Sequence, residues 1–461
     1  MAPGASDQTR WRTPSTISDF AIVNAGPVQE AANMQNNRRI LIQRVRFDMG
    51  TSRQMYMSNN ENLMVSQSEF IQRNTINHQA PYILSNAHGL VFVDSTTWFM
   101  AGGAHIERAH DAYIARNRFV RDASFQNQAE IITTHSLVLG FAYRTAVIGN
   151  TFEVANGPIT NTTRNDGETI LTEGGGNNRT ENLGSVTSAS AQTVSDSNNI
   201  QKVDAFGDGI PENYGVAIVA GAGAGQTRRV TSYANGTMTV DRAWDVIPSP
   251  GSKYATFVWG LEKSIIQGNK LSNNPRGIWL YHTAIRDLDV LDNVMTEGGG
   301  IYSRTYQNLA QKLYMPQFNV RIAGNRVSNT TGRWMSHINV VFVNTDAKAF
   351  GLTNVGFEIR DNVLQANSPN VSSQWEEYAG SEGYTNMSRL ENYNGYESQT
   401  RMVGTTFQRN ACTNCEVGFR IGTGAEGTNI MSSILANTQA AWQDWNTSVT
   451  AEKSKGTLYV P

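Results

Sequence analysis

The chain has 461 residues, of which 37 are Lys or Arg and 39 are Asp or Glu, so its net charge is only −2. This balance, with no basic block, argues against a nucleic-acid partner, and no run of about 18 apolar residues is present that could form a membrane-spanning helix. The 9 Trp, 16 Tyr and 17 Phe need burial, which argues against a disordered chain.

Residues 1–20 lack the basic-then-apolar pattern of a secretory signal. We expect them to be an N-terminal tail, or the start of a domain cut from a longer chain. Turn formers are abundant in the whole sequence, with 45 Asn and 41 Gly. Short elements joined by many turns are therefore expected.

A six-residue phrase, apolar-x-[Gly/Asp/Arg]-Asn-x-apolar, recurs along the chain. Its strict copies are Ile114–Phe119, Val147–Phe152, Ile266–Leu271, Val290–Met295, Ile322–Val327 and Ile359–Leu364. Looser copies are Ile42–Phe47, Val65–Phe70 and Met402–Phe407. The copies recur about every 23–43 residues, with one longer gap, and a period in this range indicates a solenoid.

The solenoid is predicted to be built from strands. Apolar residues alternate with polar ones, and no helical i, i+3, i+4, i+7 run is found. Short strands, Gly/Asn turns and a coil of this length predict an all-β fold, a parallel β-helix of about 11–12 coils. An inward Asn at a fixed turn would hydrogen-bond to the equivalent Asn of the next coil in a stacked ladder.

The long gap between copies contains an insertion. Its first part, residues 177–200, is rich in Ser, Thr and Asn, and the following residues read as short β segments around the Gly-rich run 221–225. That run lacks the spacing and the following helix of a dinucleotide site. We expect a tail (1–20), a first half of the β-helix (21–173), an inserted linker and small β module (174–259), a second half (260–440) and a C-terminal tail (441–461).

The Gly-Asn-x-apolar phrases over residues 40–440 resemble the right-handed parallel β-helix superfamily of the pectin and pectate lyases. This resemblance implies a carbohydrate-active enzyme or a phage tailspike, and it identifies no single family. The group includes lyases, glycoside hydrolases, epimerases and tailspikes. A chain of the tailspike type would be a homotrimer. The usual opening of such chains, a capping helix with an Asp-Phe-Gly-Ala-type strand, is missing here.

The strand after each Asn phrase supplies a candidate face. Its inward residues are predicted to form one core column: Ile106, Ile131, Ile170, Ile278, Ile301 and Ile338. Alternation then points their neighbours outward. The outward set that we expect to bind substrate is Glu107, Trp279, Tyr281, Tyr302, Arg304 and His337. Exposed rings beside charged groups suit the C–H faces and hydroxyls of pyranose sugars, although such ladders can also be simple cross-strand packing.

Three carboxylates precede the insertion, and they are the candidate catalytic residues: Asp166, Glu168 and Glu173. A glycosidase needs two carboxyl groups, about 5–5.5 Å apart if retaining and about 6.5–9.5 Å if inverting. Glu173 has no second carboxylate in its own column, so the pair is not identified. Glu173 could instead form a surface pair with Arg304.

Other polar residues give weaker signals. The histidines show no ligand spacing, and Cys412 and Cys415 lack the second ligand pair of a zinc site, so no metal is assigned. The two cysteines are expected in the core or a turn, with their bridging left open. Asp287, Asp289 and Asp292 could bind Ca²⁺, but a turn role is favoured.

The sequence therefore predicts a secreted, cell-surface or virion-associated protein whose partner is a polysaccharide, without nucleic acid, membrane or cofactor. The favoured activity is glycoside hydrolysis in a groove along the β-helix. Two alternatives stay open. One is a polysaccharide lyase using Arg304, Tyr281 or His282 as base; the other is a tailspike or adhesin that binds glycan without catalysis.

Overall fold

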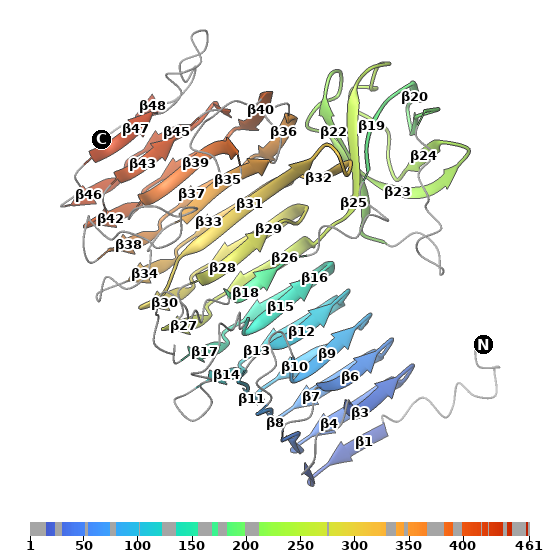
Figure 1. Cartoon of the computed structure of the whole chain (residues 1–461), viewed down its shortest axis with the longest axis vertical. Helices are drawn as coiled ribbons and strands as arrows, with labels where there is room; N and C mark the ends of the chain where they lie inside the picture. Colours follow the sequence, from blue (N-terminus) through green and yellow to red (C-terminus); the bar gives the residue numbers. More distant parts are fainter. Residues whose placement is uncertain are drawn as a thin grey trace. The chain divides into compact units, whose positions relative to one another are not determined.

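A computed structural model gives the structure of the chain (Figure 1). It describes residues 15–23, 30–50, 54–73, 80–100, 102–121, 135–154, 168–173, 182–198, 212–273, 276–328, 338–344, 349–366, 382–390, 399–415, 417–422, 424–436, 440–444 and 458–459. All regular elements in these ranges are strands. The described part contains no helix long and apolar enough to cross a membrane.

The chain divides into two compact units. The first comprises Met1–Leu171, Lys263–Trp279 and Val290–Gly299, and the second comprises Thr172–Glu262, Leu280–Asp289 and Gly300–Pro461. Each strand is assigned below to the unit that holds most of its residues.

In the first unit the chain visits three parallel sheets in turn, one strand of each per coil. Sheet A contains β1 (Ser15–Ser18), β4 (Arg38–Gln43), β7 (Glu61–Ser66), β10 (Val91–Val93), β13 (His110–Ala115), β16 (Ala142–Ile148) and β26 (Leu261–Gln267). Sheet B contains β2 (Ala21–Val23), β5 (Arg46–Asp48), β8 (Glu69–Ile71), β11 (Thr96–Trp98), β14 (Arg118–Arg121), β17 (Thr151–Val154), β27 (Lys270–Ser272) and β30 (Val294–Thr296). Sheet C contains β3 (Glu30–Gln35), β6 (Gln54–Ser58), β9 (Tyr82–Ser85), β12 (Ala104–Glu107), β15 (Leu137–Gly140), β18 (Glu168–Thr172) and β28 (Arg276–Tyr281).

The second unit repeats this plan. Sheet A contains β29 (Ile285–Leu291), β33 (Gln317–Ala323), β37 (Glu358–Arg360), β41 (Thr406–Gln408), β45 (Asn429–Met431) and β48 (Leu458–Tyr459), with β36 (Phe350–Val355), β40 (Gln399–Val403) and β44 (Ala425–Glu426) branching from β33. Sheet B contains β34 (Arg326–Ser328), β38 (Val363–Gln365), β42 (Ala411–Thr413) and β46 (Ile434–Ala436). Sheet C contains β31 (Ile301–Asn308), β35 (Ile338–Asn344), β39 (Glu382–Leu390), β43 (Val417–Ile421) and β47 (Ala440–Asp444), with β32 (Leu313–Met315) antiparallel to β31. The predicted parallel β-helix is confirmed.

A separate antiparallel sheet lies in the second unit, and we call it the β module. Its strands, in spatial order, are β19 (Asn182–Ser185), β25 (Lys253–Val258), β22 (Tyr214–Ala220), β23 (Thr227–Ala234), β24 (Thr237–Val240), β21 (Thr193–Ser195) and β20 (Ser188–Ser190). The Gly-rich run 221–225 is the turn from β22 to β23, and Gly221, Gly223 and Gly225 adopt positive φ there. Glycine is the residue that takes this conformation at least cost.

The core of each coil is formed by inward side chains that stack on their equivalents. In sheet A of the first unit the stack is Ile42, Val65, Phe92, Ile114 and Val147, all fully buried. In sheet B, Phe119 lies on Phe152 with ring centroids 4.7 Å apart. This like-on-like stacking explains why the same apolar residue types recur at one position of the phrase.

The predicted asparagine ladder is present at the corner between sheets A and B. In the first unit the backbone N–H and side-chain N–H of Asn117 donate to Asn150 Oδ1, those of Asn150 donate to Asn269, and those of Asn269 donate to Asn293, all at 2.9–3.0 Å. In the second unit the same pattern joins Asn325, Asn362 and Asn410. Ser68 and Ser95 take the position in earlier coils.

Two details of the predicted register are wrong. Ile106 pairs with Leu139, and Leu137 pairs with Ile170, so Ile106 and Ile170 do not share a column, while Ile131 lies outside the described residues. Phe407 pairs with Ile359, so the phrase of that coil is Phe407–Cys412 and not Met402–Phe407. Both errors arise because the connections before these strands vary in length, and a fixed offset cannot follow them. The predicted pairing of Ile301 with Ile338 is correct.

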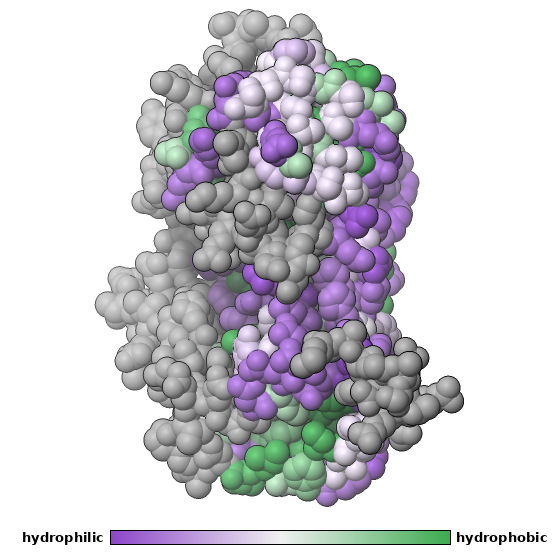
Figure 2. Space-filling view, turned by 90° about the vertical axis from the view of Figure 1, so that its right-hand side faces the viewer, coloured by the Kyte–Doolittle hydropathy of each residue, from purple (hydrophilic) through white to green (hydrophobic). Residues whose placement is uncertain are grey.

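Cys412 and Cys415, whose state the sequence left open, form a disulfide at the end of β42. Both are fully buried. On the face shown in Figure 2, hydrophilic residues cover much of the described surface, with a hydrophobic area at the lower end.

Candidate functional site

The predicted site residues fall into several groups. Asp166 and His337 lie outside the described residues. Glu173 follows β18 and is exposed, and Glu107 ends β12 with its carboxylate 4.0 Å from His105 Nδ1. Glu168 and Trp279 belong to a cluster in the first unit, and Tyr281 and Arg304 belong to a cluster in the second. The two clusters are treated in turn.

The first cluster surrounds Glu168 at the start of β18. Its carboxylate lies 2.6 Å from His135 Nδ1 and accepts a hydrogen bond of 2.7 Å from Arg276 Nη1. The Arg276 guanidinium lies 4.4 Å from the centre of the Trp279 ring. The Glu168 carboxylate is therefore in contact with both a histidine and an arginine side chain.

This setting determines the charge of Glu168. Burial by itself would raise the pKa of the carboxyl group, but the hydrogen bond from His135 and the charges of Arg276 and His135 outweigh it and lower the pKa from 4.5 to about 2. A buried carboxylate with so low a pKa stays ionised and gives up no proton near neutral pH. Its geometry fits an internal ion pair better than a general acid.

Two of the predicted ring faces are not on the surface. Trp279 is 4% exposed and Tyr302 is 1% exposed. Alternation places both on the outer side of their strands, but it does not show what lies over them. For Trp279 the structure supplies part of the answer, because the Arg276 side chain stacks on its ring.

The second cluster contains the rings that remain accessible. Tyr281, at the end of β28, stacks on His282 with centroids 4.0 Å apart, and His282 packs on Tyr306 of β31 at 4.3 Å. All three side chains are half-buried. We call Tyr281, His282 and Tyr306 the ring platform.

A buried arginine supports the ring platform. Arg304 is 0% exposed, and its Nη1 donates to the Tyr281 hydroxyl at 2.6 Å. Asn308 Nδ2 donates to the Tyr306 hydroxyl at 3.2 Å. The structure thus brings together Tyr281 and Arg304, two of the predicted substrate-binding residues, and fixes both tyrosine rings through their hydroxyl groups.

Burial and the nearby Arg304 lower the pKa of His282 from 6.5 to about 2. His282 is therefore a neutral aromatic ring at any ordinary pH. Its stacking between two tyrosines fits a structural and binding surface, and its weak basicity argues against proton abstraction.

Sequence reasoning missed Tyr306, and it considered His282 only as a base. A signal for Tyr306 was present, because it lies two residues after Arg304 on a strand and so shares the side of Tyr302 and Arg304. His282 adopts φ 44° directly after β28, a turn conformation that strand alternation does not predict. Within the described ranges, no group of three or more His, Cys, Asp and Glu side chains is arranged to hold a metal ion.

Comparisons with known proteins give distant similarities. No protein-family model matches the chain, and no curated protein matches it. Among solved structures, the chain is similar to the Dettilon tailspike protein gp208, with 10% identity over 92% of this chain and 62% of that one at a TM-score of 0.44. It is also similar to PfbA, a surface adhesin of Streptococcus pneumoniae, with 11% identity over 88% of this chain and 84% of that one at a TM-score of 0.42.

A third similar structure is the polygalacturonase of Erwinia carotovora ssp. carotovora, with 9% identity, 97% of this chain and 98% of that one covered, and a TM-score of 0.40. The chain spans less than two thirds of the tailspike, at 62% of its length. Identities this low identify no family.

Proposed function

We propose that this β-helix is an extracellular glycoside hydrolase that binds a polysaccharide on the ring platform. The observation that carries the proposal is the half-buried stack of Tyr281, His282 and Tyr306, in which Arg304 holds the Tyr281 hydroxyl and Asn308 holds that of Tyr306. Aromatic faces bind the C–H faces of pyranose rings, and the adjoining hydroxyl and amide groups can bond to sugar hydroxyls. Neutral rings with fixed hydroxyls lose little entropy when a sugar binds.

Hydrolysis is favoured over lyase chemistry by the state of His282 and Arg304, two of the three candidate bases. A lyase must remove a proton α to a uronate carboxylate. His282, with its pKa lowered to about 2, is a weak base, and Arg304 is buried against Tyr281. Neither side chain suits that step.

The proposed catalytic carboxylate is Glu173, which is exposed while Glu168 is held in its internal ion pair. Asp166 is proposed as the second carboxyl group of the pair. The alternative function, glycan binding without catalysis, uses the same ring platform. Only the presence or absence of substrate turnover distinguishes the two functions.

The test is a panel of polysaccharides with two readouts, the release of reducing ends and the absorbance of unsaturated uronates. We expect reducing ends without unsaturated products. Glu173→Gln should lower turnover by at least about a hundredfold while binding persists, because the amide keeps the shape but cannot transfer a proton or attack a sugar carbon. Glu153→Gln, at an exposed carboxylate paired with Arg118, is the matched control and should retain activity.

A second pair of variants tests the ring platform. Tyr306→Ala should weaken glycan binding by about tenfold or more through the loss of a stacking face. Tyr233→Ala removes an equally half-buried tyrosine from the β module and should leave binding unchanged. Unchanged affinity in Tyr306→Ala would refute the platform, and full turnover in Glu173→Gln would refute the catalytic assignment.

A further inference from the structure

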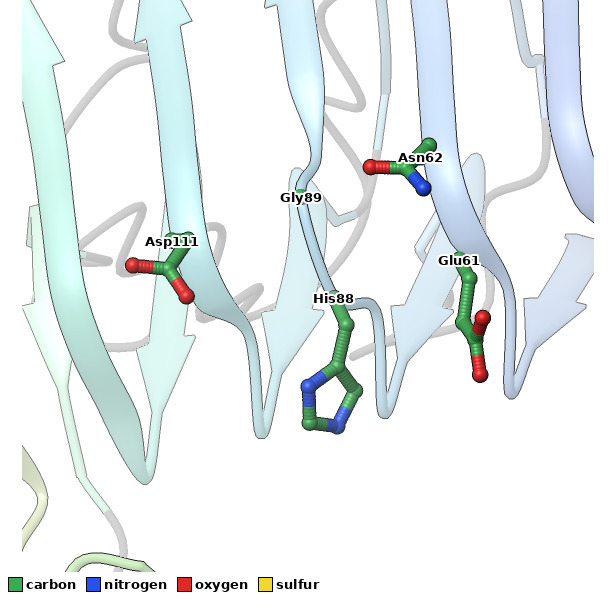
Figure 3. A pocket seen from close by; sticks show the side chains of 5 residues that line it. All are labelled: Glu61, Asn62, His88, Gly89 and Asp111. Carbon is green, nitrogen blue, oxygen red and sulfur yellow. The ribbon is translucent and has the colours of Figure 1, made fainter.

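A pocket lies in the first unit, where β7, β10 and β13 of sheet A begin on successive coils. Its volume is about 370 Å³, and it is lined by Glu61, Asn62, His88, Gly89 and Asp111. Figure 3 shows His88 projecting between Glu61 on one side and Asp111 on the other. None of these residues belongs to the clusters described above.

One wall of the pocket is formed by a residue without a side chain. On successive coils the residue at this corner adopts a left-handed conformation, in the order Arg39, Asn62, Gly89, Asp111 and Arg144, with φ between 50° and 68°. Gly89 is the member of this series without a side chain. A Cβ atom at Gly89 would lie 2.7 Å from Asn62 Oδ1, so the end of the Asn62 side chain lies over the glycine. A side chain at position 89 would displace that amide and enter the notch lined by Asn62 and Asp111.

The lining is polar but close to neutral. Arg38 binds both carboxylate oxygens of Glu61, at 2.8 and 3.1 Å, and Arg144 binds both oxygens of Asp111, at 2.5 and 2.7 Å. Each acid is therefore balanced by an arginine. Carboxylates in such pairs still have lone pairs that can accept hydrogen bonds from hydroxyl groups.

The ring of His88 packs on a histidine of the next coil. Glu61, His88 and His110 occupy equivalent positions on three coils, and the His88 and His110 rings lie 4.5 Å apart. His110 in turn packs edge-on against Tyr143 at 5.7 Å. The His88 ring thus presents a supported face to the pocket.

An apolar ridge lies two residues further along the same three strands. Met64, Val91 and Tyr113 each follow a member of the corner series by two residues and occupy one register column. Met64 is 39% exposed and Tyr113 is 38% exposed. A polar notch beside an exposed apolar ridge is the two-sided surface that a sugar ring fits, with hydroxyls toward one part and C–H groups toward the other.

We infer that this pocket is a second carbohydrate site, which binds an uncharged pyranose unit. Glu61 and Asp111 accept hydrogen bonds from its hydroxyls, and the Asn62 amide donates to them or accepts from them. Tyr113 packs on its apolar face. An acidic sugar is disfavoured because it would meet two carboxylates whose arginines are already engaged. The inference uses residues of the first unit alone, and so it stands or falls separately from the ring platform.

The test replaces Gly89 by asparagine, whose side chain would fill the notch. Asn is among the residues best tolerated at positive φ, and Asn62 holds the equivalent place one coil earlier, so Gly89→Asn should fold. Gly149→Asn is the matched control, because Gly149 has φ 62° and no atom within 4 Å of an added Cβ. Asp111→Asn is a second variant that removes an acceptor without filling the space.

The probes are neutral hexasaccharides of glucose and mannose, with hexagalacturonate as the acidic counterpart. Binding is measured by calorimetry in the Tyr306→Ala background, together with hydrogen exchange of peptides covering β7, β10 and β13. We expect a neutral hexasaccharide to protect these strands, and Gly89→Asn and Asp111→Asn to weaken its binding about tenfold or more while Gly149→Asn does not. Unchanged binding in Gly89→Asn, no protection by any neutral probe, or preference for hexagalacturonate would overturn the inference.

Discussion

At the scale of single residues, the corner asparagine replaces hydrogen bonds that the turning backbone cannot make for itself. Asn269 accepts from the backbone and side chain of Asn150, and its own Nδ2 donates to Val147 O and to Asn293 Oδ1. The side chain is fully buried. A corner between two sheets leaves backbone groups without ladder partners, and the amide has a donor and an acceptor to satisfy them.

Asn269→Ala should lower the free energy of unfolding by about 1–3 kcal/mol, because it leaves buried donors and acceptors unsatisfied on both neighbouring coils. Denaturant unfolding measures the effect. Asn33→Ala is the control, since Asn33 is exposed and its side chain accepts a hydrogen bond from the neighbouring Gln35 at the surface. If the two variants lost the same stability, the ladder would contribute no more than a surface amide.

At the scale of elements, sheets A and B could be predicted from the sequence because the corner Asn ties their strands at a fixed spacing. Sheet C could not be aligned as well. The stretch that precedes each of its strands varies in length, with 5 residues between Trp98 of β11 and Ala104 of β12 but 15 between Arg121 of β14 and Leu137 of β15. The register of sheet C therefore depends on which apolar side chains stack. Ile106 accordingly pairs with Leu139 and not with Ile170.

The candidate site was predictable to a similar degree. The alternation of residues along a strand predicted that Tyr281 and Arg304 lie on the outer side of the sheet, and the structure joins them by a hydrogen bond. Alternation could not give burial, because the exposure of Trp279 depends on an Arg276 side chain whose direction the sequence does not fix. The ionic state of Glu168 was equally hidden, since His135 comes from another coil.

Close approach of neighbouring coils gives a prediction about sheet C. A Cβ atom at Gly103, just before β12, would lie 2.1 Å from the backbone oxygens of His135 and Ser136 on the next coil. Backbone cannot move aside as a side-chain end can, so Gly103→Ala should cost about 2–4 kcal/mol and lower the melting temperature.

The control for Gly103→Ala is Gly268→Ala. Gly268 has φ 63° but no atom within 4 Å of an added Cβ. Gly268→Ala should therefore lower stability only through its unfavourable backbone conformation, by about 1–2 kcal/mol. A milder loss in Gly103→Ala than in Gly268→Ala would show that the coils can move apart at this point.

At the scale of the whole molecule, the described residues of each unit include a buried or half-buried group whose protonation opposes folding. In the first unit it is Glu168, and in the second it is His282. Both have a folded-state pKa of about 2, but their ordinary values differ, at 4.5 for the carboxyl group and 6.5 for the imidazole. In each case the unfolded chain binds a proton that the native state does not, so stability present above the ordinary pKa is lost as pH falls.

The two groups should therefore destabilise the protein in different pH windows. Loss from His282 begins below pH 6.5, and loss from Glu168 is added below pH 4.5, both continuing toward pH 2. His282→Phe, which keeps a stacked ring, should flatten the fall in stability between pH 6.5 and 4.5 in peptides of the second unit. Glu168→Gln should flatten the fall below pH 4.5 in peptides of the first unit, although it lowers stability at neutral pH by leaving Arg276 without its carboxylate.

Hydrogen exchange followed by peptide across this pH range measures both units in one sample, and each variant serves as the control for the other. The prediction for His282 fails if His282→Phe and the wild type lose protection in parallel from pH 6.5 downward. The prediction for Glu168 fails if Glu168→Gln keeps the wild-type slope below pH 4.5. Success of both would show that the acid limit of the fold is set by two buried contacts, because exposed ion pairs between coils, such as Arg116 with Asp94, are worth little in water.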